Sequence, residues 1–155
     1  MVRLNIGCGN YYLDGWVNID KDTNVKADEY YDISEGLKNK DNSVDEILLS
    51  HVLMYFTEKE VRSVLKECYR VLKKEGRLRI TEDSPLKKRN AEQQKQYGDG
   101  VLFEMEDMVG LLFDTNFSFV SISDAFPEVS HHLNLPDSYP LAKGPNSVYF
   151  LTATK

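Results

Sequence analysis

The feature of this sequence that most constrains its fold is a short apolar run that ends in two closely spaced glycines. Residues Val2 to Ile6 predict a β-strand, and the loop Asn5-Ile6-Gly7-Cys8-Gly9-Asn10 completes it. Glycine has no Cβ, so a Gly-x-Gly loop lets a ligand approach the backbone closely. The same pattern also fits a tight turn that binds nothing. The loop alone therefore leaves both interpretations open.

A second short run, Trp16 to Asp20, ends in a carboxylate that can accept hydrogen bonds from both hydroxyls of a ribose. A pyrophosphate would favour a third glycine and the N-terminus of a substantial helix. Residues Asn10 to Gly15 are too few, and too interrupted by glycine, to form that helix. S-adenosylmethionine carries a sulfonium cation and no phosphate, so glycine access and carboxylates suit it better than they suit a dinucleotide.

The remaining pattern predicts strands alternating with helices. Such alternation is typical of an α/β fold with a parallel sheet that binds ligands at the carboxyl ends of its strands. We therefore expect a Rossmann-like, mostly parallel, twisted seven-strand sheet with shortened or missing N-terminal helices. The five further predicted strands are Glu29–Asp32, Glu46–Ser50, Arg77–Thr81, Phe117–Ser123 and Ser147–Thr154, and the two predicted helices are Glu58–Leu72 and one around Met105–Leu112.

The helix over Glu58–Leu72 has signals at both ends. Thr57 and Glu60 have the spacing of a capping box, and Phe56 precedes them as a hydrophobic staple. The run Lys73-Lys74-Glu75-Gly76 predicts a cationic last turn followed by a glycine stop.

Length and composition indicate one domain, residues 1–155, with 41% hydrophobic residues for its core. The net charge of -6 argues against nucleic acid as a partner. No apolar stretch reaches the roughly 20 residues of a membrane span, and we expect no membrane association and a cytoplasmic location. The two cysteines, Cys8 and Cys68, lack disulfide or zinc spacing, and no metal site is predicted.

The ordered set of motifs resembles the class I S-adenosylmethionine-dependent methyltransferases, in particular a small methyltransferase type 11-like family often linked to glycan biosynthesis. The resemblance rests on Leu4 to Asn10 and Leu13 to Asp20, and continues through Asp32-Ile33, Asp41 to Asp45, Ser50 to Leu53 and Tyr69 to Gly76. It implies an enzyme with a cofactor site. By this resemblance the residues that bind S-adenosyl-L-methionine are Asn5, Gly7, Cys8, Gly9, Asn10, Asp20, Asp32, Ile33 and Ser50.

Methyl transfer needs a base only when the acceptor is a hydroxyl or a protonated amine. His51 follows the predicted strand Glu46–Ser50 and is the candidate catalytic base, although a histidine that merely packs at a strand end fits the same position. The tyrosines at 11, 12, 30 and 31 are interpreted as packing residues. The irregular segments Asp83–Phe103 and Asp124–Asn146, the second containing His131 and His132, are expected to line the acceptor side.

Two functions remain open at this point. The first is a methyltransferase acting on a small-molecule or sugar-containing, glycan-type acceptor. The alternative is a catalytically inactive module or partner subunit that binds S-adenosylmethionine. The segments Gly9–Gly15 and Lys21–Asp28 are too short or too polar for amphipathic helices, so one face of the sheet is expected to be under-covered. Either the irregular segments fold back over that face or a second copy covers it, and because those segments are expected at the acceptor side, we predict a homodimer.

Overall fold

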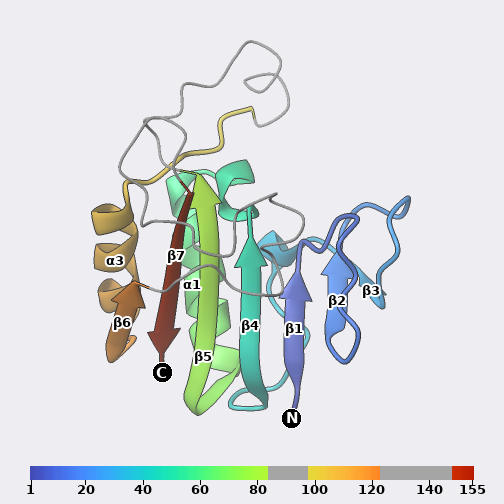
Figure 1. Ribbon diagram of the computed structural model, residues 1–155, viewed down its shortest axis with the longest axis horizontal. Helices are drawn as coiled ribbons and strands as arrows, with labels where there is room; N and C mark the ends of the chain where they lie inside the picture. The colour runs from blue at the N-terminus through green and yellow to red at the C-terminus, as the bar shows by residue number, and fades with distance from the viewer. Residues whose placement is uncertain (84–97, 123–147) are drawn as a thin grey trace.

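The computed structural model describes residues 1–83, 98–122 and 148–155, and its centre is one seven-stranded sheet (Figure 1). The strand order is β3-β2-β1-β4-β5-β7-β6. Strands β1 to β5 run parallel to one another, whereas β7 is antiparallel to both β5 and β6. The strands are β1 (Arg3–Ile6), β2 (Val17–Asp20), β3 (Glu29–Tyr30), β4 (Val44–Ser50), β5 (Leu72–Asp83), β6 (Phe119–Ile122) and β7 (Val148–Thr154). The predicted Rossmann-like, mostly parallel sheet is confirmed.

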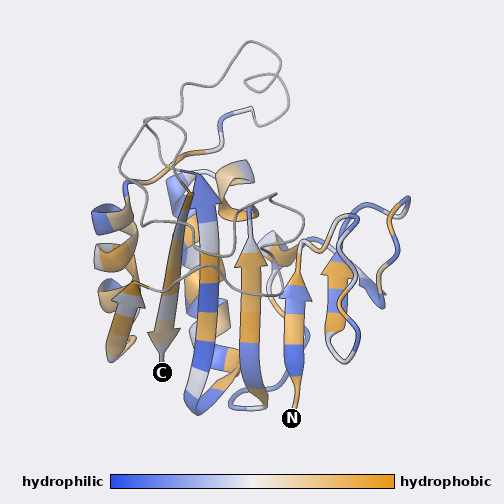
Figure 2. Ribbon diagram, in the orientation of Figure 1, coloured by the Kyte–Doolittle hydropathy of each residue, from blue (hydrophilic) through white to orange (hydrophobic). Residues whose placement is uncertain are grey.

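Strand β4 lies at the centre of the sheet, and β1, which leads into the glycine loop, lies next to it. Ile47, Leu48 and Leu49 are fully buried, and Figure 2 shows the upper part of β4 in the orange of apolar residues, above a hydrophilic start. Ile47 and Leu49 belong to the main core cluster, while Leu48 belongs to a smaller cluster on the other face. A strand that is apolar on both faces fits the interior of a parallel sheet. Strand β1 pairs with β4 on one side and with β2 on the other, so the glycine loop leaves the interior of the sheet.

Helix α1 (Glu58–Val71) begins as predicted and ends differently. The Thr57–Glu60 capping box is present, and one face of the helix, including Val61, Leu65 and Cys68, is buried. The predicted cationic last turn and glycine stop are wrong. Leu72 is fully buried and already pairs with Val44, so Lys73, Lys74 and Gly76 lie in β5.

The helices of the described residues cover one face of the sheet. Helix α3 (Met105–Asp114) buries Met108, Leu111 and Leu112 in the same cluster that α1 joins. Two short 3-10 turns, η1 (Ile33–Glu35) and η2 (Leu53–Tyr55), follow β3 and β4. Residues 7–16 and 21–28 connect β1, β2 and β3 without a helix, which confirms the expectation of missing N-terminal helices. Among all the residues that the structure describes, no helix is long and apolar enough to cross a bilayer.

Parts of the irregular segments lie outside the described residues. These are residues 84–97 of the first segment and the whole of the second, including His131 and His132. The described end of the first segment returns to η2: the Val101 backbone N–H donates to the Phe56 carbonyl at 3.0 Å. A Cβ on Gly100 would collide with the Met54 carbonyl oxygen, so glycine allows this close approach.

Candidate functional site

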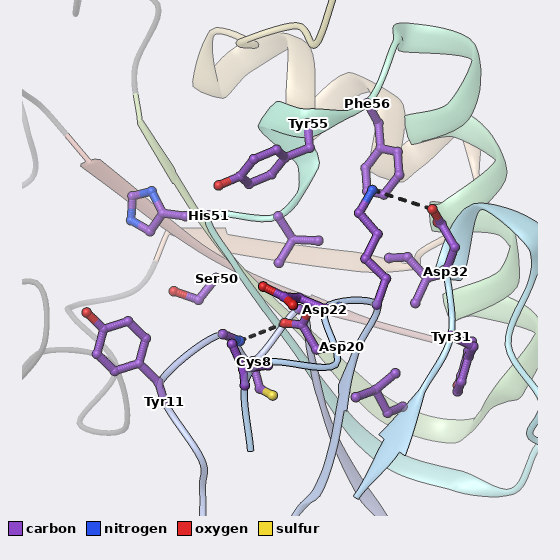
Figure 3. Close-up of a pocket in the computed structure, with 17 residues that line it drawn as sticks. Cys8, Tyr11, Asp20, Asp22, Tyr31, Asp32, Ser50, His51, Tyr55 and Phe56 are labelled. Carbon is purple, nitrogen blue, oxygen red and sulfur yellow. Dashed lines mark hydrogen bonds and ion pairs between the residues drawn. The ribbon is translucent and has the colours of Figure 1, made fainter. Parts of the chain in front are cut away.

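A cavity of about 420 Å³ lies at the carboxyl ends of β1, β2 and β4 (Figure 3). This is within the ordinary size range of small-molecule sites. Four short segments form its walls: the glycine loop, residues 19–25 around the end of β2, residues 31–33 after β3, and residues 50–56 after β4. Because parallel strands end at the same edge of the sheet, residues distant in sequence meet here.

The glycine loop uses its two glycines for different purposes. Gly7 and Gly9 have φ angles of 65° and 50°, which side chains other than glycine's rarely tolerate. A Cβ on Gly7 would lie 2.6 Å from Cγ2 of Val52, so glycine allows the segment after β4 to pack against the loop. A Cβ on Gly9 would meet no atom within 4 Å, so the Gly9 backbone is open at the pocket.

Asp20 connects the end of β2 to the glycine loop. Its Oδ2 accepts the Gly9 backbone N–H at 2.7 Å, and its Oδ1 accepts the Asp22 backbone N–H at 2.9 Å. A carboxylate has about four acceptor positions, so these two bonds fix its orientation while leaving capacity for a ligand. Asp20 thus lines the pocket as an oriented hydrogen-bond acceptor.

Asp32 and Lys21 form an ion pair at the pocket, with Lys21 Nζ 3.5 Å from Asp32 Oδ2. Asp32 also caps η1, because its Oδ1 accepts the Ser34 backbone N–H at 2.9 Å. Burial opposes the charged form of Asp32, but the hydrogen bonds from Ser34 and the nearby Lys21 ammonium outweigh it and lower the pKa. The carboxylate is therefore ionised at neutral pH, and the next residue, Ile33, supplies an apolar wall.

Ser50 and His51 leave β4 toward the opposite side of the cavity from Asp32, where Tyr11 and Tyr55 also lie (Figure 3). His51 has a φ of 55°, a left-handed conformation that is uncommon outside glycine. Its backbone N–H donates to the Thr81 carbonyl at 2.8 Å, which connects it to β5. The imidazole therefore reaches the pocket from a constrained backbone.

Two predicted cofactor residues do not line the cavity. Asn5 is buried beneath the loop, where its Nδ2 donates to the Tyr11 carbonyl at 2.9 Å and to Oδ1 of Asn18 at 2.8 Å. It shapes the loop from below. Asn10 is exposed and lies outside the lining. The structure brings together the other predicted site residues, namely Gly7, Cys8, Gly9, Asp20, Asp32, Ile33, Ser50 and His51.

Several lining residues were not predicted from the sequence, and aromatic residues are prominent among them. Tyr11 and Tyr31 line the pocket, and Tyr31 also packs against the main core cluster, as its interpretation as a packing residue predicts. Each belongs to an adjacent tyrosine pair of which only one member lines the cavity. Successive side chains of an extended segment point to opposite sides, so the sequence could have indicated that one tyrosine of each pair faces the pocket. The other unpredicted lining residues are Ile19, Lys21, Asp22, Val25, Val52, Tyr55 and Phe56.

The pocket is acidic and holds no activated thiol. Asp20, Asp22 and Asp32 line it with Lys21 as the one cation among the described lining residues. Burial, together with the charge of Asp20, raises the pKa of Cys8 to about 11, so its thiol is protonated at neutral pH. Such a pocket favours a cationic, hydroxyl-bearing ligand over a phosphate.

Comparison with known proteins agrees with this geometry. The family model described as a methyltransferase domain matches residues 24–80. No curated protein sequence matches the chain. A S-adenosylmethionine-dependent methyltransferase from Archaeoglobus fulgidus is similar in structure, with 18% identity, a TM-score of 0.70, and coverage of 99% of this chain and 85% of that one.

Two other solved structures are also similar. The first is a possible histamine N-methyltransferase from Thermotoga maritima, with 20% identity, a TM-score of 0.72 and coverage of 99% and 81%. The second is a Haemonchus contortus phosphoethanolamine N-methyltransferase in complex with phosphomonomethylethanolamine and S-adenosylhomocysteine, with 16% identity, a TM-score of 0.68 and coverage of 99% and 48%. This chain has the fold of the S-adenosylmethionine-dependent methyltransferases and contains a match to the methyltransferase domain.

Proposed function

We propose that this chain is an S-adenosylmethionine-dependent methyltransferase that acts on a small-molecule or sugar-containing acceptor. The observation that carries the proposal is that a single cavity collects the open Gly9 backbone, the oriented Asp20 carboxylate, Asp32 and His51. A glycine loop, a carboxylate at the next strand end and a negatively charged lining suit a cationic cofactor with ribose hydroxyls.

Each wall of the cavity has a proposed role. Gly7 and Gly9 would lie against the amino-acid part of the cofactor, Asp20 would accept the ribose hydroxyls, and Asp32 with Ile33 would contact the adenine. When bound, S-adenosylmethionine supplies an activated methyl group on a sulfonium. The chain's own task is then to hold the acceptor atom in line with that methyl group and to exclude water, because positioning is the main source of acceleration in a direct displacement.

His51 is the proposed base for acceptors that must lose a proton. An imidazole nitrogen would accept the proton of an acceptor hydroxyl or ammonium and release it to solvent afterwards. Tyr11 and Tyr55 support a ring-containing acceptor, because they are 48% and 44% exposed and lie on the His51 side of the pocket. The apolar face of a sugar or aromatic ring packs well on such side chains.

Titration and product assays test this proposal. Calorimetry should detect binding of S-adenosylmethionine and no comparable binding of NAD. Incubation with hydroxyl and amine acceptors, including sugars, should release S-adenosylhomocysteine. We expect His51→Ala to lower turnover on a hydroxyl acceptor by about 100-fold while leaving cofactor affinity nearly unchanged. Cofactor binding with no product on any acceptor class would instead favour the alternative, an inactive binding module.

A homodimer and a cytoplasmic location stay predictions. The expectation that one face of the sheet is under-covered gives little support to a homodimer, because Trp16, Leu48 and Phe150 on that face are already buried within one chain. A stronger basis is the edge strand β6, where Phe119 and Ile122 are exposed in the described part of the sheet. Light scattering should show a dimer at micromolar concentration, and Phe119→Lys should shift it to a monomer.

A further inference from the structure

The carboxyl group of Glu82 is buried in the core and faces the backbone of the segment after β4. The residue is only 2% exposed. Its Oε1 accepts the backbone N–H groups of Val52 and Leu53, at 2.9 and 2.7 Å. These amides begin η2, whose N-cap, Val52, provides no side-chain hydrogen bond. Glu82, 30 residues away in the sequence, therefore takes the part of the missing N-cap.

The segment that Glu82 holds carries one wall of the pocket. His51 comes immediately before the bonded amides, and Tyr55 and Phe56 come shortly after them. Between these residues, the Val52 side chain packs closely against Gly7 of the glycine loop. Displacing Val52 and Leu53 would thus move the candidate base, the aromatic wall and a contact of the glycine loop together.

A purely structural residue at position 82 would be expected to be apolar. Leu78 and Ile80 occupy the same face of β5 as Glu82 and are fully buried in the main core cluster. Burial raises the pKa of Glu82 to about 8 despite the hydrogen bonds from Leu53 and Val52, so the charged form is costly here. Its second oxygen, Oε2, has no hydrogen-bond partner among the described residues. The two backbone hydrogen bonds are thus what the carboxyl group contributes that an apolar side chain would not.

We propose that Glu82 is a positioning residue that fixes residues 51–56 as the acceptor-side wall of the pocket. This inference rests on the proposed methyltransferase function for its effect on turnover, but not for its effect on the backbone. Glu82 is not among the described residues that line the cavity. It acts through the amides of Val52 and Leu53, and through them on His51 and Tyr55.

Glu82→Leu and Glu82→Gln separate positioning from simple filling of the core. Leucine fills the space without an acceptor, so we expect melting temperature to be kept or raised while amide exchange at Val52 and Leu53 accelerates at least about tenfold. On an accepted substrate, kcat should fall about tenfold or more, with a smaller change in the cofactor Kd. Glutamine retains a carbonyl oxygen for both amides, and should restore exchange and kcat to within about threefold of the wild type.

Glu46→Gln is the matched control. Glu46 is another buried carboxylate, 6% exposed, whose Oε1 accepts from Arg79 at 3.1 Å on the adjacent strand. Its loss should lower global stability and leave exchange at Val52 and Leu53 unchanged relative to other core amides. The same local acceleration in Glu46→Gln as in Glu82→Leu would overturn the proposal.

Amide exchange in the wild type and binding of S-adenosylmethionine test the role of Glu82 further. Should Glu82→Leu not fold, exchange in the wild type decides: protection of the Val52 and Leu53 amides comparable to that of β4 supports the proposal, and exchange at the rate of an exposed loop overturns it. If the wild type binds no S-adenosylmethionine, the proposed function fails while exchange still tests the role of Glu82. Normal turnover in a folded Glu82→Leu variant overturns the role in the site even where the cofactor binds.

Discussion

The segments after β1 and β4 leave neighbouring parallel strands at the same end of the sheet, yet they are fixed in different ways. The loop after β1 places glycines where the backbone has positive φ, and local hydrogen bonds to Ile19 and Asp20 hold it. The segment after β4 places His51 in a left-handed conformation, and Glu82 of β5 holds the amides that follow. The first segment is specified by residues close in sequence, whereas the second depends on a distant buried carboxyl group.

The largest effect that distinguishes the two segments should be the pH dependence of stability. The pKa of Glu82 is raised to about 8 by burial, with Asp83 adding to the effect and Tyr149 facing it from β7. The folded protein therefore binds this proton more tightly than the unfolded chain. The contribution of Glu82 to stability is therefore greatest below the usual glutamate pKa, and it falls as pH rises to about 8, by at most about 1.4 kcal/mol per pH unit.

Urea unfolding between pH 5 and pH 9 checks this expectation. Glu82→Gln should remove most of the decline, because glutamine does not titrate. The difference between variant and wild type isolates Glu82 from the other ionisable groups of the chain, which the two proteins share. Parallel curves for the two proteins would show that Glu82 does not bind its proton more tightly in the folded state.

The next effect concerns the glycine loop. Gly7→Ala should lower the free energy of unfolding by about 3 kcal/mol, because the new Cβ has an unfavourable φ and collides with Val52. Gly9→Ala is the control: it has the same backbone strain and no collision, and should cost about 1 kcal/mol. Equal losses in urea unfolding would mean that contact with the β4 segment does not matter.

The smallest effect should come from His51. Replacing it by glycine relieves the left-handed strain, so His51→Gly should stabilise the folded state by about 0.5 to 1 kcal/mol in denaturant unfolding. It should also reduce turnover by removing the imidazole. A loss of stability instead would indicate that packing of the histidine ring outweighs the strain.

The parts of the site that could be predicted from sequence are those with local signatures. The glycine spacing, the carboxylate at the end of β2 and the Thr57–Glu60 box are each contained in a few residues, and the structure has all three features. The end of α1 was mispredicted, because tertiary pairing of Leu72 with Val44 overrode the local stop signal.

Other features depend on long-range contacts that no short pattern encodes. Glu82 directly follows the predicted strand Arg77–Thr81, and nothing near it in sequence indicates that its carboxyl group meets amides 30 residues away. Tyr31 and Lys21 join the pocket only because β2 and β3 pair in parallel, which brings the residues after both strands to one edge. Asn5 differs from these residues. Its position in the sequence suggested contact with a ligand, but its side chain is buried beneath the glycine loop and donates hydrogen bonds to Tyr11 and Asn18.

Calorimetric titration of S-adenosylmethionine into the wild type and Asp20→Ala tests the central claim most directly. The wild type should bind, and Asp20→Ala should weaken binding by about 1 to 3 kcal/mol without unfolding the domain, because it removes charge-assisted hydrogen bonds. Asp45→Ala is the control, since Asp45 also accepts a backbone N–H, that of Val2, but does not line the pocket. It should bind like the wild type. Absence of binding by the folded wild type, or unchanged affinity in Asp20→Ala, would contradict the account.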